Sequence, residues 1–120
     1  MPGDLGADVI KVERPGSDPA RNMGPSYHEK PDPERSVFRW IFNTSKRGVT
    51  LDIETHAGQE IIKKLVKSAD LVIESFAPGY LDKPGTGYND LEKINPWTIL
   101  ISTSLFGQTE PYRIMGAPIV

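Results

Sequence analysis

The chain has 120 residues, of which 38% are hydrophobic, with a formal net charge of −2, eleven prolines and eleven glycines; it therefore has room for one domain rich in turns. Charges of both signs are spread along the chain without a basic block, which argues against nucleic-acid binding, and the absence of cysteine excludes disulfides, thiolate metal ligands and a cysteine nucleophile. No apolar run approaches the roughly 20 residues of a membrane span and the N-terminus lacks a signal-peptide pattern, so we expect a cytoplasmic protein without a membrane partner.

The first predicted element is a strand over residues 7–13, where apolar and polar residues alternate and β-branched residues are frequent. It ends at Arg14-Pro15-Gly16, because proline cannot continue a strand ladder and glycine permits a reversal. Residues 17–35 are polar and contain four prolines. They predict a long exposed loop, which within a compact domain is usually either functional or disordered.

The middle of the chain predicts a helix, a strand and a second helix. Residues 37–43 are apolar and aromatic and predict a short helix that packs inward. Residues 49–53 predict a strand. Thr55 is the expected N-cap of a helix over about residues 56–68, because apolar side chains recur there at helical spacing.

The last third of the chain continues the alternation of strands and helices. Residues 69–74 predict a strand, and residues 88–94 predict a short helix with Asn89 or Asp90 as its cap. Residues 98–104 are nearly all β-branched or apolar, as in a strand that is covered on both faces. Strand, helix, strand, helix and strand in succession predict an α/β fold with a parallel sheet and right-handed crossovers.

Ligands of an open parallel sheet bind in the loops beyond the carboxyl ends of the strands. Those loops offer Arg14, Phe76, small residues and free backbone amides. Such a rim suits an anionic, partly aromatic ligand, with Phe76 as a stacking face and Arg14 or Lys83 pairing with a phosphate. A nucleotide carrier fits this description, and so do many other ligands. From this pattern alone Arg14 fits a surface arginine at the end of a strand better than a ligand contact, and Phe76 fits a core residue equally well.

Other polar features of the sequence carry little chemistry. His28 lies in the polar loop and His56 at a helix start, and neither has a further ligand at metal-binding spacing, so we expect both to be solvated and no metal to bind. Lys46-Arg47 is typical of a solvated turn. The glycines of Gly85-Thr86-Gly87 follow no predicted strand and favour a phosphate loop only weakly.

Five blocks of the sequence are similar, in order, to blocks of family III CoA-transferases, the CaiB/BaiF group. They are LGADVIKVERPG (5–16), NTSKRGVTLD (43–52), ADLVIESFAPG (69–79), LEKINP (91–96) and LFGQTEPY (105–112). Together the blocks extend over nearly the whole chain, which is a far stronger signal than any single motif. The group includes formyl-CoA transferase and α-methylacyl-CoA racemase.

The resemblance implies a Rossmann-like large domain, with a parallel sheet and flanking helices, next to a small domain. Residues 1–120 would form part of the CoA-binding large domain of a longer parent protein. The first strand and helix of that domain, and the small domain, would lie outside them. Members of the family form interlocked homodimers. They use coenzyme A thioesters as substrates and hold no tightly bound cofactor.

The resemblance also assigns CoA contacts by position. By this resemblance, Arg14 contacts the nucleotide of CoA and residues 51–54 contact its adenine. Residues 75–77 line the CoA site, and Lys83 pairs with a phosphate. The CoA-contacting residues implied in this way are Arg14, Leu51, Asp52, Ile53, Glu54, Ser75, Phe76, Ala77 and Lys83. The chain departs from the family at Ser75, where asparagine is usual, and at Lys83, where lysine keeps the charge of arginine but loses its bidentate fork.

By this resemblance the parent protein transfers CoA from an acyl-CoA to a carboxylic acid through a covalent aspartyl intermediate. The nucleophilic aspartate would lie beyond residue 120, so the chain as given would carry no catalytic residue and would be inactive. A 2-methylacyl-CoA racemase of the same family is one alternative, since its catalytic histidine and aspartate would also lie beyond residue 120. A catalytically dead CoA- or nucleotide-binding module is another.

Overall fold

The structure is a computed structural model in which residues 2–16, 18–104, 107 and 109 are described. The chain divides into two compact units, Met1–Asp52 and Ile53–Val120, here called the N-terminal and the C-terminal unit. The boundary falls inside the segment 51–54, for which the family resemblance predicts contact with the adenine. Each unit is described by itself.

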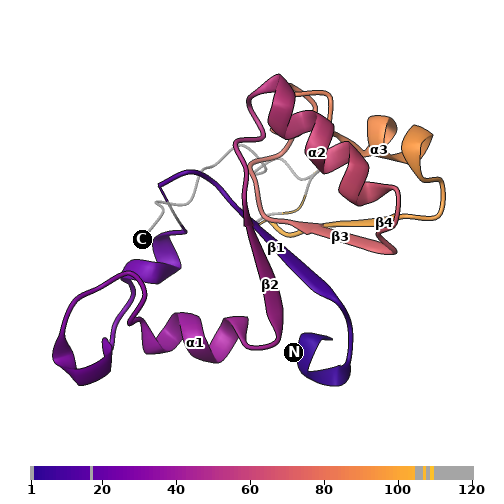
Figure 1. Ribbon diagram of the computed structural model, residues 1–120. Coiled ribbons are helices and arrows are strands. Elements are labelled where there is room, and N and C mark those ends of the chain that lie inside the picture. The colour runs from indigo at the N-terminus through magenta and orange to yellow at the C-terminus, as the bar shows by residue number, and fades with distance from the viewer. Residues whose placement is uncertain (1, 17, 105–106, 108, 110–120) are drawn as a thin grey trace. The chain divides into compact units, whose positions relative to one another are not determined.

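The N-terminal unit is built around a pair of parallel strands. Its elements are η1 (Pro2–Leu5), β1 (Val9–Glu13), η2 (Pro19–Asn22), η3 (Tyr27–Glu29), α1 (Val37–Asn43) and β2 (Lys46–Thr50). In the ladder, Val9 lies opposite Lys46 and Glu13 lies opposite Thr50 (Figure 1).

The second strand begins three residues earlier than the sequence predicts. The chain turns at Ser45, whose φ is 60°, immediately after the C-cap of α1 at Thr44. The polar residues Lys46 and Arg47 therefore lie within β2 and not in a turn, since ladder pairing with β1 begins directly after the reversal. Lysine is uncommon in strands, but strand propensity depends strongly on context, and here the backbone pairing with β1 decides the structure.

Short 3₁₀ helices and side-chain caps order the segment between β1 and α1. Asp18 caps η2 by accepting a hydrogen bond from the backbone N of Ala20 at 2.8 Å. Ser36 is 1% exposed and caps α1 by accepting from the backbone N of Arg39 at 3.1 Å. The same hydroxyl lies 2.7 Å from the carbonyl oxygen of Met23, so one side chain joins this segment to the start of the helix.

The C-terminal unit alternates helices and strands as predicted. Its elements are α2 (His56–Val66), β3 (Leu71–Glu74), α3 (Tyr88–Ile94) and β4 (Ile99–Ser102). The strands are parallel, with Leu71 opposite Ile99 and Glu74 opposite Ser102. Figure 1 shows α2 and α3 on the same side of this strand pair.

The two helix caps of the C-terminal unit have different outcomes. Thr55 caps α2 as predicted, because its hydroxyl accepts from the backbone N of Gly58 at 3.1 Å. The caps predicted for α3 are wrong, since Asn89 and Asp90 both lie inside the helix and its N-cap is Gly87. Gly87 is buried, and a Cβ at this position would overlap the carboxylate of Asp82, so a larger residue would require the exposed Asp82 side chain to move.

The predicted α/β fold with parallel strands is confirmed. The prediction that the strands of residues 49–104 form one sheet is wrong for the described residues. Their four strands make two two-stranded sheets, in which β2 pairs with β1 and β3 pairs with β4. The alternation of strands and helices predicts that strands are parallel. It does not predict which strands are neighbours, because a crossover can lead to more than one position in a sheet.

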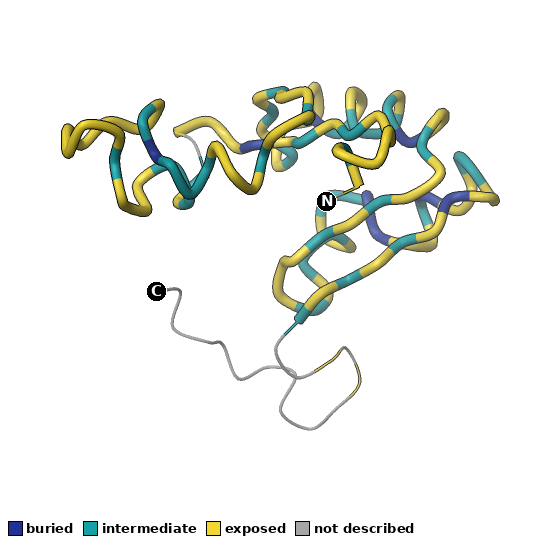
Figure 2. The backbone as a smooth tube through the Cα atoms, turned by 90° about the horizontal axis from the view of Figure 1, so that it is seen from below, coloured by how far each residue is buried: buried dark blue, intermediate teal, exposed yellow. Residues whose placement is uncertain are grey.

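Few side chains are buried in either unit. Val66 and Leu91 are the only buried large hydrophobic residues among those that the structure describes. Figure 2 shows the buried positions as short stretches scattered along the chain. Ile73 and Ile99 on the strands are about three-fifths exposed, at 61% and 62%. Within the described part of the chain, no helix has the length and apolar character needed to cross a membrane.

Candidate functional site

Arg14 and the start of segment 51–54 lie together at the carboxyl ends of β1 and β2. Arg14 directly follows the last residue of β1, and Leu51 directly follows the last residue of β2. The backbone N of Leu51 donates to the carbonyl oxygen of Glu13 at 2.8 Å, which extends the ladder by one step. Arg14 is exposed and forms no ion pair with any residue that the structure describes. Its guanidinium is therefore available to an anionic ligand at this edge.

A buried carboxylate fixes the backbone just before Arg14. Glu13 is 8% exposed, accepts from Nε of Arg21 at 2.8 Å and lies 3.4 Å from Nζ of Lys11. Burial raises the pKa of Glu13, but the hydrogen bond from Arg21 and the charge of Lys11 together outweigh it, so the pKa is lowered overall. Glu13 therefore stays ionised near neutral pH and ties the end of β1 to the segment that carries Arg21.

Two hydrogen bonds from backbone amides shape the loop after β3, which holds Ser75, Phe76 and Ala77. The backbone N of Phe76 donates to the carboxylate of Glu74 at 2.6 Å. The backbone N of Tyr80 donates to the carbonyl oxygen of Ala77 at 2.9 Å, and Gly79 between them has a φ of 76°. Proline followed by glycine at the two central positions, with this hydrogen bond, matches a type II turn. The turn sends the chain back toward Phe76.

Tyr80 joins two of the segments that the sequence assigns to CoA. Its ring stacks on that of Phe76, with centroids 4.8 Å apart and an interplanar angle of 23°. Its hydroxyl donates to Oε1 of Glu54 at 2.7 Å. Glu54 and Phe76, which are 22 positions apart in the sequence, therefore share one neighbour. Sequence reasoning missed Tyr80, although the Ala77-Pro78-Gly79-Tyr80 turn signal could have indicated that its side chain returns to Phe76.

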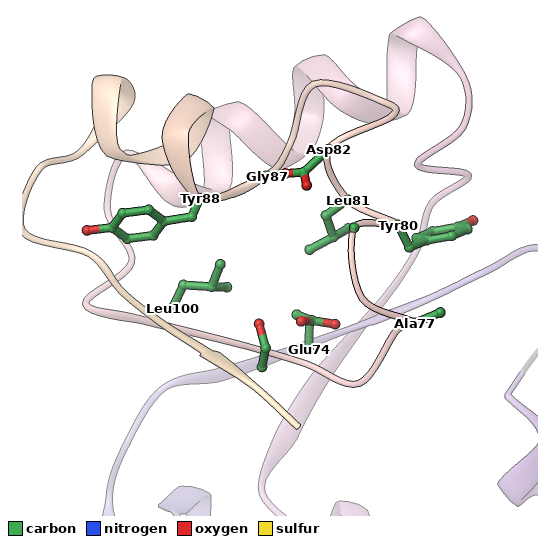
Figure 3. Close-up of a pocket in the computed structure, with 10 residues that line it drawn as sticks. Glu74, Ala77, Tyr80, Leu81, Asp82, Gly87, Tyr88 and Leu100 are labelled. Atoms are coloured by element: carbon green, nitrogen blue, oxygen red, sulfur yellow. The ribbon is translucent and has the colours of Figure 1, made fainter. Parts of the chain in front are cut away.

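A pocket of about 230 Å³ lies beside this loop in the C-terminal unit. Figure 3 shows Tyr80 and Tyr88 at opposite sides of it, with Glu74 and Leu81 between them. The residues that line it are Glu74, Ala77, Gly79, Tyr80, Leu81, Asp82, Gly87, Tyr88, Leu100 and Ser102. Of the residues predicted to contact CoA, Ala77 alone is in this lining.

The remaining predicted residues are placed as follows. Ser75 and Lys83 are exposed, and Lys83 has no acidic partner among the described residues. Ile53 is half-buried at the start of the C-terminal unit. The structure brings Arg14 to Leu51 within the N-terminal unit, and Glu54 to Phe76 within the C-terminal unit. No set of three metal-ligating side chains occurs in the part of the chain that the structure covers.

Comparison with known proteins identifies the family. Residues 1–117 match the model of CoA-transferase family III. The chain is 42% identical over 107 residues to subunit BbsE of succinyl-CoA:(R)-benzylsuccinate CoA-transferase of Thauera aromatica. The matched region covers 89% of this chain and 26% of that protein. It is 41% identical over 111 residues to succinyl-CoA–D-citramalate CoA-transferase of Chloroflexus aurantiacus, with coverages of 92% and 27%.

Solved structures agree with the sequence comparisons. A CAIB/BAIF family protein from Brucella suis superposes with a TM-score of 0.81 at 42% identity, covering 92% of this chain and 29% of that one. A hypothetical protein from Mycobacterium tuberculosis gives a TM-score of 0.79 at 34% identity, with coverages of 92% and 29%. The chain belongs to CoA-transferase family III. It spans about a quarter of the length of the curated relatives that it matches.

Proposed function

We propose that the parent protein transfers CoA from an acyl-CoA to a carboxylic acid, and that residues 1–120 bind the nucleotide end of CoA. Family membership supports the transfer, and the two relatives named above are both CoA-transferases. Their names also support transfer over the racemase alternative. The interlocked homodimer and the cytoplasmic location stay predictions from the sequence.

The observation that carries this proposal is where the predicted contacts lie. Arg14 and Leu51 stand at the carboxyl ends of one parallel strand pair, and Ser75 to Ala77 follow a strand of the other. That end of a parallel strand is where ligands of α/β folds bind. Arg14 and Lys83 are exposed cations without acidic partners among the described residues, which suits phosphate groups. Phe76 keeps 41% of its surface exposed, which leaves room for a stacked base.

Binding at this end would serve a reaction elsewhere in the parent protein. An aspartate carboxylate would attack the thioester carbonyl, the CoA thiolate would leave, and one difficult acyl transfer would become several covalent steps. We place that aspartate outside residues 1–120, so the contribution of these residues is to position the thioester through remote contacts. The chain alone would then bind CoA weakly and catalyse no transfer.

Arg14→Ala in the full-length parent protein tests the proposal. We expect CoA affinity to fall by about 5- to 150-fold, the equivalent of about 1–3 kcal/mol for a hydrogen bond to a charged group. Isothermal titration calorimetry measures the affinity, and Arg35→Ala is the matched control, because Arg35 lies in the segment before α1 beside Asp32. Unchanged affinity in Arg14→Ala would remove Arg14 from the site, and a wild-type protein that binds no CoA would refute the proposed function itself.

A further inference from the structure

The Tyr80 side chain contacts two of the predicted CoA-binding segments at once. Its hydroxyl lies 2.7 Å from Oε1 of Glu54, just before the cap of α2. Its ring lies against that of Phe76, just after β3. The turn at Pro78-Gly79 sets both contacts, because it directs the backbone of residue 80 back along the loop.

The two contacts act on different groups. Stacking covers one face of the Phe76 ring, while 41% of the residue stays exposed. Offset-stacked aromatic rings hold each other's orientation, so Tyr80 limits the directions in which Phe76 can present its remaining surface. The hydroxyl contact orients the Glu54 carboxylate and with it the end of the segment 51–54. Tyr80 thus orients both the Phe76 ring and the Glu54 side chain.

If Tyr80 had a purely structural role, the packing of its ring would suffice and its hydroxyl would not be needed. Tyr80 is half-buried against the pocket wall, and a phenylalanine would fill the same space. Packing alone does not account for the short contact from its hydroxyl to a charged, exposed carboxylate. Hydrogen bonds to charged groups are directional and about twice as strong as those between neutral groups, which suits a group that fixes the relative position of two segments.

We propose that Tyr80 is a positioning residue for the adenine nucleotide of CoA, holding the Phe76 ring and the Glu54 segment in the relative orientation that the base requires. This inference rests on the proposed function of the same site. Tyr80 itself need not touch CoA. Its effect passes through Phe76 and Glu54, and it is confined to the nucleotide end of the ligand.

The test compares Tyr80→Phe with Tyr80→Leu in the full-length parent protein. Titration calorimetry measures affinity for CoA and for adenosine 3′,5′-bisphosphate, which carries the nucleotide end alone. Tyr80→Phe removes the hydroxyl and keeps the ring, so we expect both ligands to bind about 3- to 10-fold more weakly, by the same factor. Tyr80→Leu also removes the stacking and should weaken both by about a further 2- to 10-fold.

Matched variants separate positioning from folding. Tyr27→Phe is the control, since Tyr27 lies in the N-terminal unit and its ring contacts are with His28 and Trp40. Glu54→Ala closes a double-mutant cycle: if the hydroxyl acts through Glu54, adding Tyr80→Phe to Glu54→Ala costs less affinity than Tyr80→Phe alone. Circular dichroism checks that each variant keeps the wild-type fold.

Three results would overturn the inference. Tyr80→Phe and Tyr80→Leu could both bind CoA as the Tyr27→Phe control does. CoA could bind more weakly while adenosine 3′,5′-bisphosphate does not, which would assign Tyr80 to the pantetheine arm. The losses of Tyr80→Phe and Glu54→Ala could be fully additive, which would remove Glu54 from the effect. Failure of the wild-type protein to bind CoA would instead refute the proposed function, independently of Tyr80.

Discussion

The two units of the chain are stabilised by different kinds of interaction. In the described part of the N-terminal unit the buried residues, Glu13 and Ser36, are polar, and each holds the segment between β1 and α1 through side-chain hydrogen bonds. In the C-terminal unit the buried residues include the apolar side chains of Val66 and Leu91. Charge and hydrogen bonding position Arg14, while packing and a tight turn position Phe76.

The difference teaches how each half of the predicted site should respond to conditions. An ion-pair network responds to pH and to the loss of one charge, since the remaining charges lose their partner. Apolar packing responds to truncation of side chains and hardly to pH. In the C-terminal unit Asn95 and Thr98 donate to backbone carbonyl oxygens and carry no charge. The carboxylates of Glu54 and Glu74, which accept hydrogen bonds in that unit, are not buried as Glu13 is.

The largest expected effect concerns both units together. We expect the 120-residue chain on its own to lack a cooperative thermal transition and to bind a hydrophobic dye. Each unit has a two-stranded sheet, which is marginal in water without further cover, and strand residues such as Ile73 and Ile99 are mostly exposed. Differential scanning calorimetry and dye fluorescence measure this. A sharp melt from a monomer would show that the packing in the two units suffices.

Truncation of the buried leucine in α3 should produce the next largest effect. Leu91 is 2% exposed, and we expect Leu91→Ala to lower the free energy of unfolding of the full-length protein by about 2–5 kcal/mol. Leu5→Ala is the matched control, because Leu5 is 88% exposed in the N-terminal unit. Urea denaturation gives both values. Equal losses in the two variants would contradict the apolar character assigned to the C-terminal unit.

The sequence predicted most of the fold because local patterns decide it. The α1 and α3 helices have the predicted limits, and Thr55 caps α2, since periodicity and a capping hydroxyl are properties of neighbouring residues. Strand pairing was not predictable in the same way. That β2 pairs with β1 depends on hydrogen bonds between residues nearly 40 positions apart, which no local pattern encodes.

The candidate site shows the same limit. Position by position, the resemblance marked Arg14, Glu54 and Phe76, and the structure places each of them in a loop next to a strand end or a helix start. It did not mark Tyr80, because the contacts that single out this residue are with the protein groups of Glu54 and Phe76. The hydroxyl that reaches Glu54 becomes visible only after the turn at Gly79 has been built.

The smallest expected effect tests the contribution of the Glu13 ion pairs to the stability of the N-terminal unit. Glu13→Gln in the full-length protein should lower the free energy of unfolding by about 1–3 kcal/mol at pH 7, since Arg21 and Lys11 each lose one of their charged partners. Urea denaturation measures the loss. Asp8→Asn is the control, because the Asp8–Arg47 pair is about two-thirds exposed and should contribute less than about 1 kcal/mol.

The pH dependence gives this prediction its sign. Burial raises the pKa of both Glu13 and Asp18, but hydrogen bonds from Arg21 and Lys11 respectively, with nearby positive charge, lower both pKa values overall. A carboxylate whose folded pKa is depressed stabilises the protein above its unfolded pKa, near 4, and this stabilisation is lost as the pH falls through the folded pKa. The difference between wild type and Glu13→Gln should therefore be full at pH 7 and shrink steadily below about pH 4. A difference that stays constant down to pH 2 would mean that the Glu13 side chain stabilises the N-terminal unit by its shape and not by its charge.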